Sequence, residues 1–271
     1  MKKLVSLLLA LLLISSAIAM TACDNESATE APTEAPTETP TEAPTDENNN
    51  EKTEEDEVNN VMIFGDSYST FDGYMPEGFV SFYSENKRIE TDVTKVEETW
   101  WHLLTEECGL NLVQNNSWSG STIGYTGYNN ADASHTNSFI YRLRNLIDEG
   151  FFEENRIDTV FVFGGTNDCW ANAPLGMLKY EDITEEDLYT VRPAIVYFFR
   201  LLRETLPEAE IYCIVNTGLG IEITECFGDA SAKIGFKTIY LYRIDKYYEH
   251  PTIRGMAQIK DQIAAVINKE K

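Results

Sequence analysis

Two residues with the chemistry of a nucleophile and a base stand far apart in the chain. Ser67 lies in the motif Gly-Asp-Ser-Tyr-Ser, directly after the apolar run 61–64, and His250 precedes Pro251 near the C-terminal end. A serine on a sharp strand-to-helix turn projects its hydroxyl into a crevice, where a neighbouring histidine can take its proton. Taken alone, each has a plainer reading: a helix cap for Ser67 and a surface residue for His250.

Two further motifs could stabilise negative charge on an oxygen. Residues 115–122 read Asn-Asn-Ser-Trp-Ser-Gly-Ser-Thr, and residues 164–168 read Gly-Gly-Thr-Asn-Asp. Small residues such as Gly120 allow backbone N–H groups to approach a ligand oxygen, and the Asn167 amide is a side-chain donor. A polar turn explains the first motif equally well. The second lacks the lysine of a phosphate-binding P-loop.

Each of the first three motifs follows an apolar run that predicts a strand. The predicted strands are residues 61–64, 110–113, 159–163, 211–215 and 238–241, and helical patterns lie between them at residues 98–108, 139–150, 188–204 and 253–269. Alternating strands and helices predict a parallel sheet covered on both faces. We therefore expect a three-layer α/β/α sandwich with about five strands, with the ligand beyond the carboxyl ends of the strands.

The four motifs, in this order, resemble those of the SGNH (GDSL-type) hydrolases, over roughly residue 61 to the C-terminus. The resemblance implies a flavodoxin-like fold and a serine esterase that needs no cofactor or metal. It makes Ser67 the nucleophile and His250 the base. It also assigns the oxyanion hole to the N–H groups of Ser67 and Gly120 and to the Asn167 amide.

The sequence departs from that family in the carboxylate of the triad. The family has Asp three residues before its His, but Tyr247 stands there. A strand ending near residue 244 would leave Asp245 in the crevice, so we expect Asp245 to orient the imidazole. Glu249 would point away from His250 in an extended segment. A backbone carbonyl could instead orient the ring, which would leave a dyad.

The N-terminal region predicts export and anchoring. Residues 1–22 combine two lysines with a short apolar run, as in a signal peptide, and residues 20–23 resemble a bacterial lipobox that ends in Cys23. Residues 23–60 are acidic and rich in Thr, Glu, Ala and Pro, which predicts a lipidated cysteine followed by a disordered tether. The esterase domain then spans residues 61–271. We expect the protein on the outer face of the bacterial cytoplasmic membrane.

Composition excludes other classes of function. The net charge of -24 argues against nucleic acid as a partner, and residues 24–58 carry about half of that charge. The three histidines are far apart in sequence, which argues against a metal site. Of the cysteines beyond Cys23, Cys213 lies in an apolar run and is expected in the core, and no CxxC pair is present.

The expected substrate is a small-molecule or glycan ester with a short acyl group such as acetyl. An aromatic-rich segment, residues 71–83, is long enough to be a binding loop, and aromatic rings stack on sugar faces. Packing of the loop explains these rings equally well. Trp170 could line the acyl pocket. The alternative function is a non-catalytic glycan-binding lipoprotein that retains the hydrolase fold.

Overall fold

A computed structural model of the chain describes residues 58–86 and 88–269. The predicted signal peptide (1–22), Cys23 and most of the predicted tether (23–60) lie outside these residues. Within the described part of the chain, no helix combines the length and the apolar character needed to cross a bilayer.

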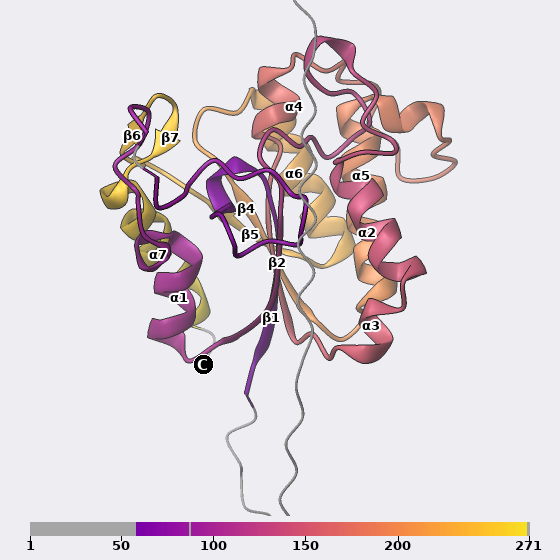
Figure 1. The fold of residues 1–271 in the computed structure, drawn as a ribbon. Helices are drawn as coiled ribbons and strands as arrows, with labels where there is room; N and C mark the ends of the chain where they lie inside the picture. Colours follow the sequence, from indigo (N-terminus) through magenta and orange to yellow (C-terminus); the bar gives the residue numbers. More distant parts are fainter. Residues whose placement is uncertain (1–57, 87, 270–271) are drawn as a thin grey trace, which may run out of the picture. The chain divides into compact units, whose positions relative to one another are not determined.

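Five parallel strands form the central sheet, in the order β2-β1-β3-β4-β5 (Figure 1). They are β1 (Asn60–Gly65), β2 (Asn111–Ser117), β3 (Thr159–Phe163), β4 (Glu210–Val215) and β5 (Lys237–Tyr240). Apolar runs form the inner strands β1, β3 and β4, because both faces of a parallel sheet are buried there. The predicted α/β fold with about five strands is confirmed.

Helices cover both faces of this sheet. In Figure 1, α1 and α7 lie on one face, and α2, α5 and α6 lie on the other. The helices are α1 (Trp100–Cys108), α2 (Phe139–Asp148), α3 (Phe151–Glu154), α4 (Thr166–Trp170), α5 (Val191–Thr205), α6 (Ile221–Ile234) and α7 (Ile253–Ile267). Short 3-10 turns occupy Ser67–Ser69, Val96–Glu98, Tyr128–Asn130 and Glu186–Tyr189.

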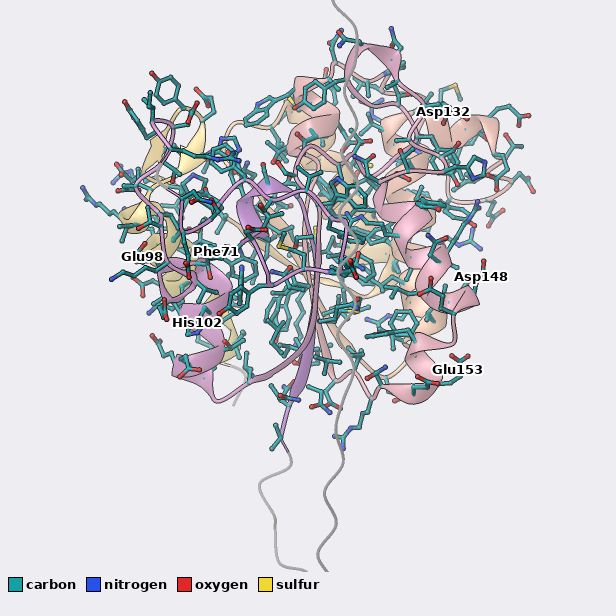
Figure 2. All side chains as sticks on the ribbon, viewed as in Figure 1. Phe71, Glu98, His102, Asp132, Asp148 and Glu153 are labelled. Atoms are coloured by element: carbon teal, nitrogen blue, oxygen red, sulfur yellow. The ribbon has the colours of Figure 1, made fainter. Side chains whose placement is uncertain are left out.

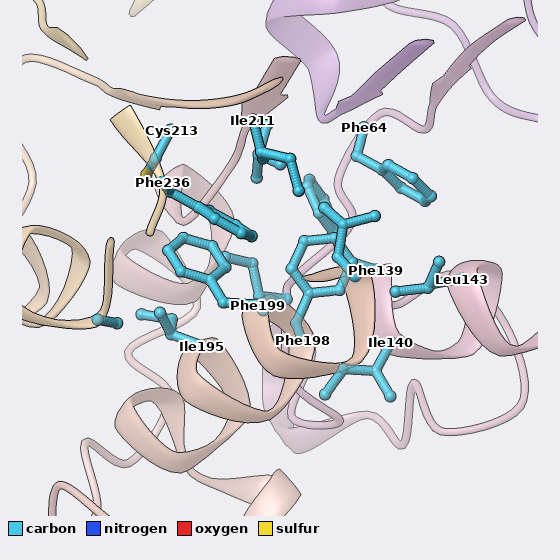
Figure 3. Packing of buried hydrophobic residues seen from close by; sticks show 14 of the residues in the cluster. Phe64, Phe139, Ile140, Leu143, Ile195, Phe198, Phe199, Ile211, Cys213 and Phe236 are labelled. Atoms are coloured by element: carbon cyan, nitrogen blue, oxygen red, sulfur yellow. The ribbon is translucent and has the colours of Figure 1, made fainter. Parts of the chain in front are cut away.

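Side chains that alternate along each strand fill two separate cores. Met62 and Phe64 face the core beneath α2, α5 and α6, whereas Val61 and Ile63 face the core beneath α1 and α7. Figure 3 shows the first core, where Phe198 and Phe199 of α5 meet aromatic and aliphatic side chains from the sheet and from α2. Burial of each side chain of this size stabilises the folded state by about 1.5–3 kcal/mol. This packing holds in place the strand ends that carry the site.

Two of the differences between the predicted elements and the structure concern the sheet and its covering helices. Helix α6 was not predicted, because its acidic residues and Gly228 interrupt the apolar pattern. Strand β2 continues to Ser117, so Asn115 and Asn116 belong to the strand and not to the loop after it. Asn115 donates from its amide to the carbonyl of Ser69 at 2.8 Å, which satisfies a buried polar side chain within the sheet.

Candidate active site

The first three motifs meet at the carboxyl ends of neighbouring strands. Gly65, the last residue of β1, is in register with Ser117 of β2 and with Phe163 of β3. Ser67 follows Gly65 by two residues, and Asn167 follows Phe163 by four. Because parallel strands end at the same edge, the topology brings these motifs to one crevice, as expected.

Close packing fixes the turn that carries Ser67. The Asp66 carboxylate accepts a hydrogen bond from the Tyr68 N–H at 3.0 Å and so caps the 3-10 turn that begins at Ser67. A Cβ on Gly65 would lie 2.4 Å from the Ser117 hydroxyl and 2.7 Å from the Ser69 Cβ, so glycine is required there. Ser67 itself is only 3% exposed.

His250 lies on a small antiparallel hairpin that precedes α7. Strands β6 (Lys246–Tyr247) and β7 (His250–Pro251) are joined by Tyr248 and Glu249, with φ values of 44° and 60°. Two successive residues in the left-handed region are typical of a type I′ turn, whose twist matches that of the hairpin. This turn sets the backbone immediately before the imidazole.

The hairpin brings the imidazole to the nucleophile. His250 Nε2 lies 3.0 Å from Ser67 Oγ, and His250 Nδ1 lies 3.0 Å from the carbonyl oxygen of Tyr248. A carbonyl can only accept, so Nδ1 carries the proton and donates it to Tyr248. Nε2 is then the basic nitrogen, and it faces the Ser67 hydroxyl.

Aromatic side chains enclose the imidazole. The Phe82 ring stacks on it with centroids 3.6 Å apart and planes 6° apart, and the Trp170 ring lies edge-on at 5.9 Å. Tyr68 and Tyr83 donate their hydroxyls to the carbonyls of Glu249 and Pro251, which ties down the hairpin. Burial lowers the pKa of His250 against the raising effect of the Tyr248 carbonyl, so the ring is neutral at pH 7.

The expectation that Asp245 orients the imidazole is not met by the geometry. Strand β5 ends at Tyr240, so Asp245 is exposed, outside the crevice. Its carboxylate accepts from the Thr252 hydroxyl, and that hydroxyl also caps α7 by accepting from Gly255 N–H at 3.1 Å. The structure therefore corresponds to the alternative in which a backbone carbonyl orients His250.

Two backbone N–H groups beside the crevice are unused. Within the described residues, neither the N–H of Ser67 nor that of Gly120 donates a hydrogen bond. Gly120 has φ +82°, a conformation that glycine adopts readily, and space for a Cβ is open around it. Each N–H is therefore available to a ligand oxygen, which is the property that an oxyanion hole requires.

The Asn167 amide is buried and held at both ends. Its Nδ2 donates to the carbonyl of Ser121 at 2.9 Å, and its Oδ1 accepts from the Tyr128 hydroxyl at 2.8 Å. The side chain is 2% exposed, at the start of α4. One N–H of the amide is left over for a ligand.

Buried acids support the loops around these donors. Asp168 accepts from the N–H groups of Ile123 and Gly124, which follow the Gly120 turn, and burial raises its pKa to about 6. Burial raises the pKa of Asp66 to about 7. One Asp66 oxygen has no hydrogen-bond partner within the described part of the chain.

Arg142 connects the Ser67 and Gly120 motifs through buried hydrogen bonds. The sequence did not predict this role, because an arginine in a helix is usually exposed. The side chain is 2% exposed and extends from α2 below Phe139, whose ring centroid lies 4.5 Å from the guanidinium. All five of its N–H groups are used. They donate to the carbonyls of Asn137, Asn116 and Gly65, to the Asn116 amide oxygen, and to the Ser121 hydroxyl.

The other histidines and the thiols lie apart from this pair. His102 is on α1 in the outer layer (Figure 2), and His135 packs near Tyr141; neither contacts Ser67 or His250 in the described structure. Cys213 is buried in the core, as predicted. Among the described residues, no three His, Cys, Asp or Glu side chains gather as metal ligands would.

Known proteins match the whole described domain. The sequence profile of the GDSL-like lipase/acylhydrolase family matches residues 59–267. Two crystal structures assigned as GDSL-like lipases are similar. The one from Bacteroides ovatus is 44% identical with a TM-score of 0.73, covering 78% of this chain and 99% of the other. The one from Bacteroides uniformis is 42% identical with a TM-score of 0.72, covering 78% and 96%.

A more distant similarity concerns the fold alone. An acetyl xylan esterase from Butyrivibrio proteoclasticus is 15% identical with a TM-score of 0.53, covering 78% of this chain and 64% of the esterase. No curated protein matches the chain. The profile match extends over more than two thirds of the sequence and includes the Ser67 and His250 motifs. The chain belongs to the GDSL-like lipase/acylhydrolase family and is an esterase.

Proposed function

We propose that this esterase hydrolyses short-chain acyl esters, such as acetyl groups on carbohydrates, through an acyl-enzyme formed on Ser67. The observation that carries the proposal is the 3.0 Å approach of His250 Nε2 to Ser67 Oγ, with Nδ1 donating to the Tyr248 carbonyl. That arrangement makes Nε2 a base without any carboxylate partner. The pair is a dyad in which backbone geometry replaces the third residue.

The proposed reaction has two halves. Ser67 Oγ attacks the ester carbonyl as its proton passes to His250 Nε2, and the oxyanion meets the Ser67 and Gly120 N–H groups and the Asn167 amide. The C–O bond to the alcohol breaks as Nε2 returns the proton to the leaving oxygen. Water then gives a proton to Nε2 and attacks the acyl carbonyl; the bond to Ser67 Oγ breaks as Nε2 returns that proton to Oγ, which releases the acid and restores both residues.

Exposed aromatic faces beside the crevice support a carbohydrate substrate. Trp170 is 39% exposed and Tyr128 is 40% exposed, and these two follow the oxyanion motifs along the chain. Such rings stack on sugar faces, and the Trp170 ring lies 5.9 Å from the His250 ring, beside the nucleophile. The fold shared with an acetyl xylan esterase agrees with this choice.

We further propose that the domain works outside the cytoplasm, anchored through a lipid on Cys23. The support is the sequence of residues 1–23 and the acidic, Pro-rich segment that follows. Membrane fractionation of cells that express the wild type and Cys23→Ser tests the location. Anchoring predicts that the wild type sediments with membranes and that the variant does not.

Hydrolysis of p-nitrophenyl esters of increasing chain length, and of acetylated xylan, tests the proposed chemistry. We expect the highest kcat/KM for acetate, with loss of activity by several orders of magnitude in Ser67→Ala, because the nucleophile is gone. Ser84→Ala, outside the four motifs, is the control and should stay active, because the Ser84 hydroxyl makes only a long bond to the Asn86 carbonyl. Wild-type rates no higher than those of Ser67→Ala on every ester would favour a non-catalytic glycan-binding protein.

A further inference from the structure

The orientation of the Asn167 amide is determined by its two partners. The Ser121 carbonyl can only accept, so the nitrogen end of the amide faces it, at 2.9 Å. The oxygen end therefore faces the Tyr128 hydroxyl, which donates to it at 2.8 Å. With both ends occupied, the second N–H of the amide has a fixed direction.

The loop that carries Tyr128 is built to hold it in place. Asn129 and Asn130 both have positive φ values, 56° and 57°, which asparagine tolerates better than most residues. The loop closes on itself through the Gly127 N–H, which donates to the Ala131 carbonyl at 2.8 Å. A hydroxyl on such a loop has a defined position.

The chemistry of Tyr128 suits a permanent donor. Burial of the hydroxyl raises the pKa of Tyr128 to about 12, so the phenol keeps its proton at any working pH. Since the ring is 40% exposed, removing the hydroxyl alone leaves the core intact. Replacing Tyr128 by Phe therefore removes the hydroxyl donor without disturbing the folded core.

The geometry points to Tyr128 as a positioning residue that acts through Asn167 in the oxyanion hole. Its hydroxyl holds the amide oxygen so that the remaining N–H stays aimed at the developing oxyanion. It also polarises the amide, because hydrogen bonds in a chain strengthen one another. The inference rests on the proposed function.

Steady-state kinetics on p-nitrophenyl acetate with full-length Tyr128→Phe test this role. We expect kcat to fall roughly three- to tenfold, the effect of losing one neutral hydrogen bond, with KM unchanged. In the Asn167→Ala background, where the amide is absent, the same substitution should cause no further loss. Such coupling separates action through Asn167 from a general structural effect.

Tyr189→Phe is the matched control. Tyr189 is 39% exposed and donates to Asp132 at 3.2 Å, so its loss removes a hydroxyl from the same region without touching Asn167. We expect its kcat to equal that of the wild type. Thermal melting of all variants excludes unfolding as the cause.

Three outcomes would overturn the inference: an unchanged kcat in Tyr128→Phe, a raised KM with unchanged kcat, or an equal loss in both backgrounds. If the activity of Asn167→Ala is no higher than that of Ser67→Ala, a further loss in the double variant cannot be measured. The comparison of kcat between Tyr128→Phe and Tyr189→Phe then decides the inference. A wild type without activity above Ser67→Ala would instead reject the proposed function. The two failures are therefore distinguishable.

Discussion

At the scale of single residues, the site depends on which group accepts the Nδ1 proton of His250. A side-chain carboxylate and a backbone carbonyl both fix the tautomer, but a carboxylate also stabilises the imidazolium that forms during the reaction. In this chain the acceptor is the Tyr248 carbonyl at 3.0 Å. Burial lowers the pKa of His250, and the raising effects of the Tyr248 carbonyl and the Glu249 carboxylate do not offset it.

Asp245→Asn separates the two arrangements. We expect kcat to stay close to the wild-type value, because Asn can still accept from the Thr252 hydroxyl and the carboxylate does not reach His250. Loss of a triad carboxylate would cost about 10⁴-fold in kcat. A loss of that size on p-nitrophenyl acetate would mean that Asp245 moves to the imidazole during turnover.

At the scale of elements, the hairpin β6-β7 supplies the base, and its turn is strained. Tyr248 and Glu249 both occupy the left-handed region, which costs about 1–2 kcal/mol for each residue other than Gly, Asn or Asp. The strain persists because the Tyr68 and Tyr83 hydroxyls hold the carbonyls on either side of His250. The turn therefore lowers the stability of the fold, and it fixes the position of the Tyr248 carbonyl.

Replacing the turn by Asn-Gly, through Tyr248→Asn with Glu249→Gly, relieves this strain. The entropy that glycine adds to the unfolded chain offsets part of the relieved strain. We therefore expect a net gain of about 1 kcal/mol and a rise in Tm of roughly 2–4 °C, with kcat unchanged because the backbone carbonyl is retained. Calorimetry measures the Tm, and ester kinetics measure kcat. Tyr242→Asn, an exposed change outside the turn, is the control. A fall in kcat at normal Tm would assign a role to the Tyr248 or Glu249 side chain.

The elements themselves were mostly predictable, and the site less so. Strand β3 was predicted with its observed ends, because Thr159 and the four apolar residues after it stand between Asp158 and Gly164. The end of β2 was missed, since side-chain hydrogen bonds inside the sheet compensate its buried asparagines.

Contacts that depend on backbone conformation left no trace in the sequence. The Tyr248 carbonyl bond follows from two φ values, and the stacking of Phe82 on His250 follows from the path of a long loop. Phe82 stood within a segment already noted for its aromatic residues, but nothing distinguished it from its neighbours. The order of the motifs predicted Ser67 and His250, whereas the contacts around these two residues became visible only in the folded structure.

At the scale of the whole molecule, a buried carboxyl links stability to pH. Asp66 is fully buried and its pKa is about 7, against 3.8 when unfolded. Below pH 3.8 both states are protonated. As the pH rises from 3.8 to 7, Asp66 ionises in the unfolded state before it ionises in the folded state. The free energy of unfolding therefore falls by on the order of 4 kcal/mol. Above pH 7 that loss is complete.

Asp66→Asn should therefore stabilise the protein at alkaline pH. The amide carbonyl can still accept from Tyr68 N–H, but it has no charge to bury. We expect the difference in unfolding free energy between variant and wild type to grow from pH 4.5 to pH 8, as measured by urea denaturation. An equal difference at both pH values would show that Asp66 is ionised throughout or compensated by a charge.

The separation of the two reacting residues has a consequence for the timing of activity during synthesis. Ser67 and His250 are 183 positions apart, and the hairpin that carries His250 is seated against α7, near the end of the chain. A ribosome-bound chain contains Ser67 long before it contains His250, so it has the nucleophile without the base. The enzyme is therefore catalytically silent during this interval of its synthesis, and it can begin to cleave esters only once the β6-β7 hairpin has brought His250 to Ser67.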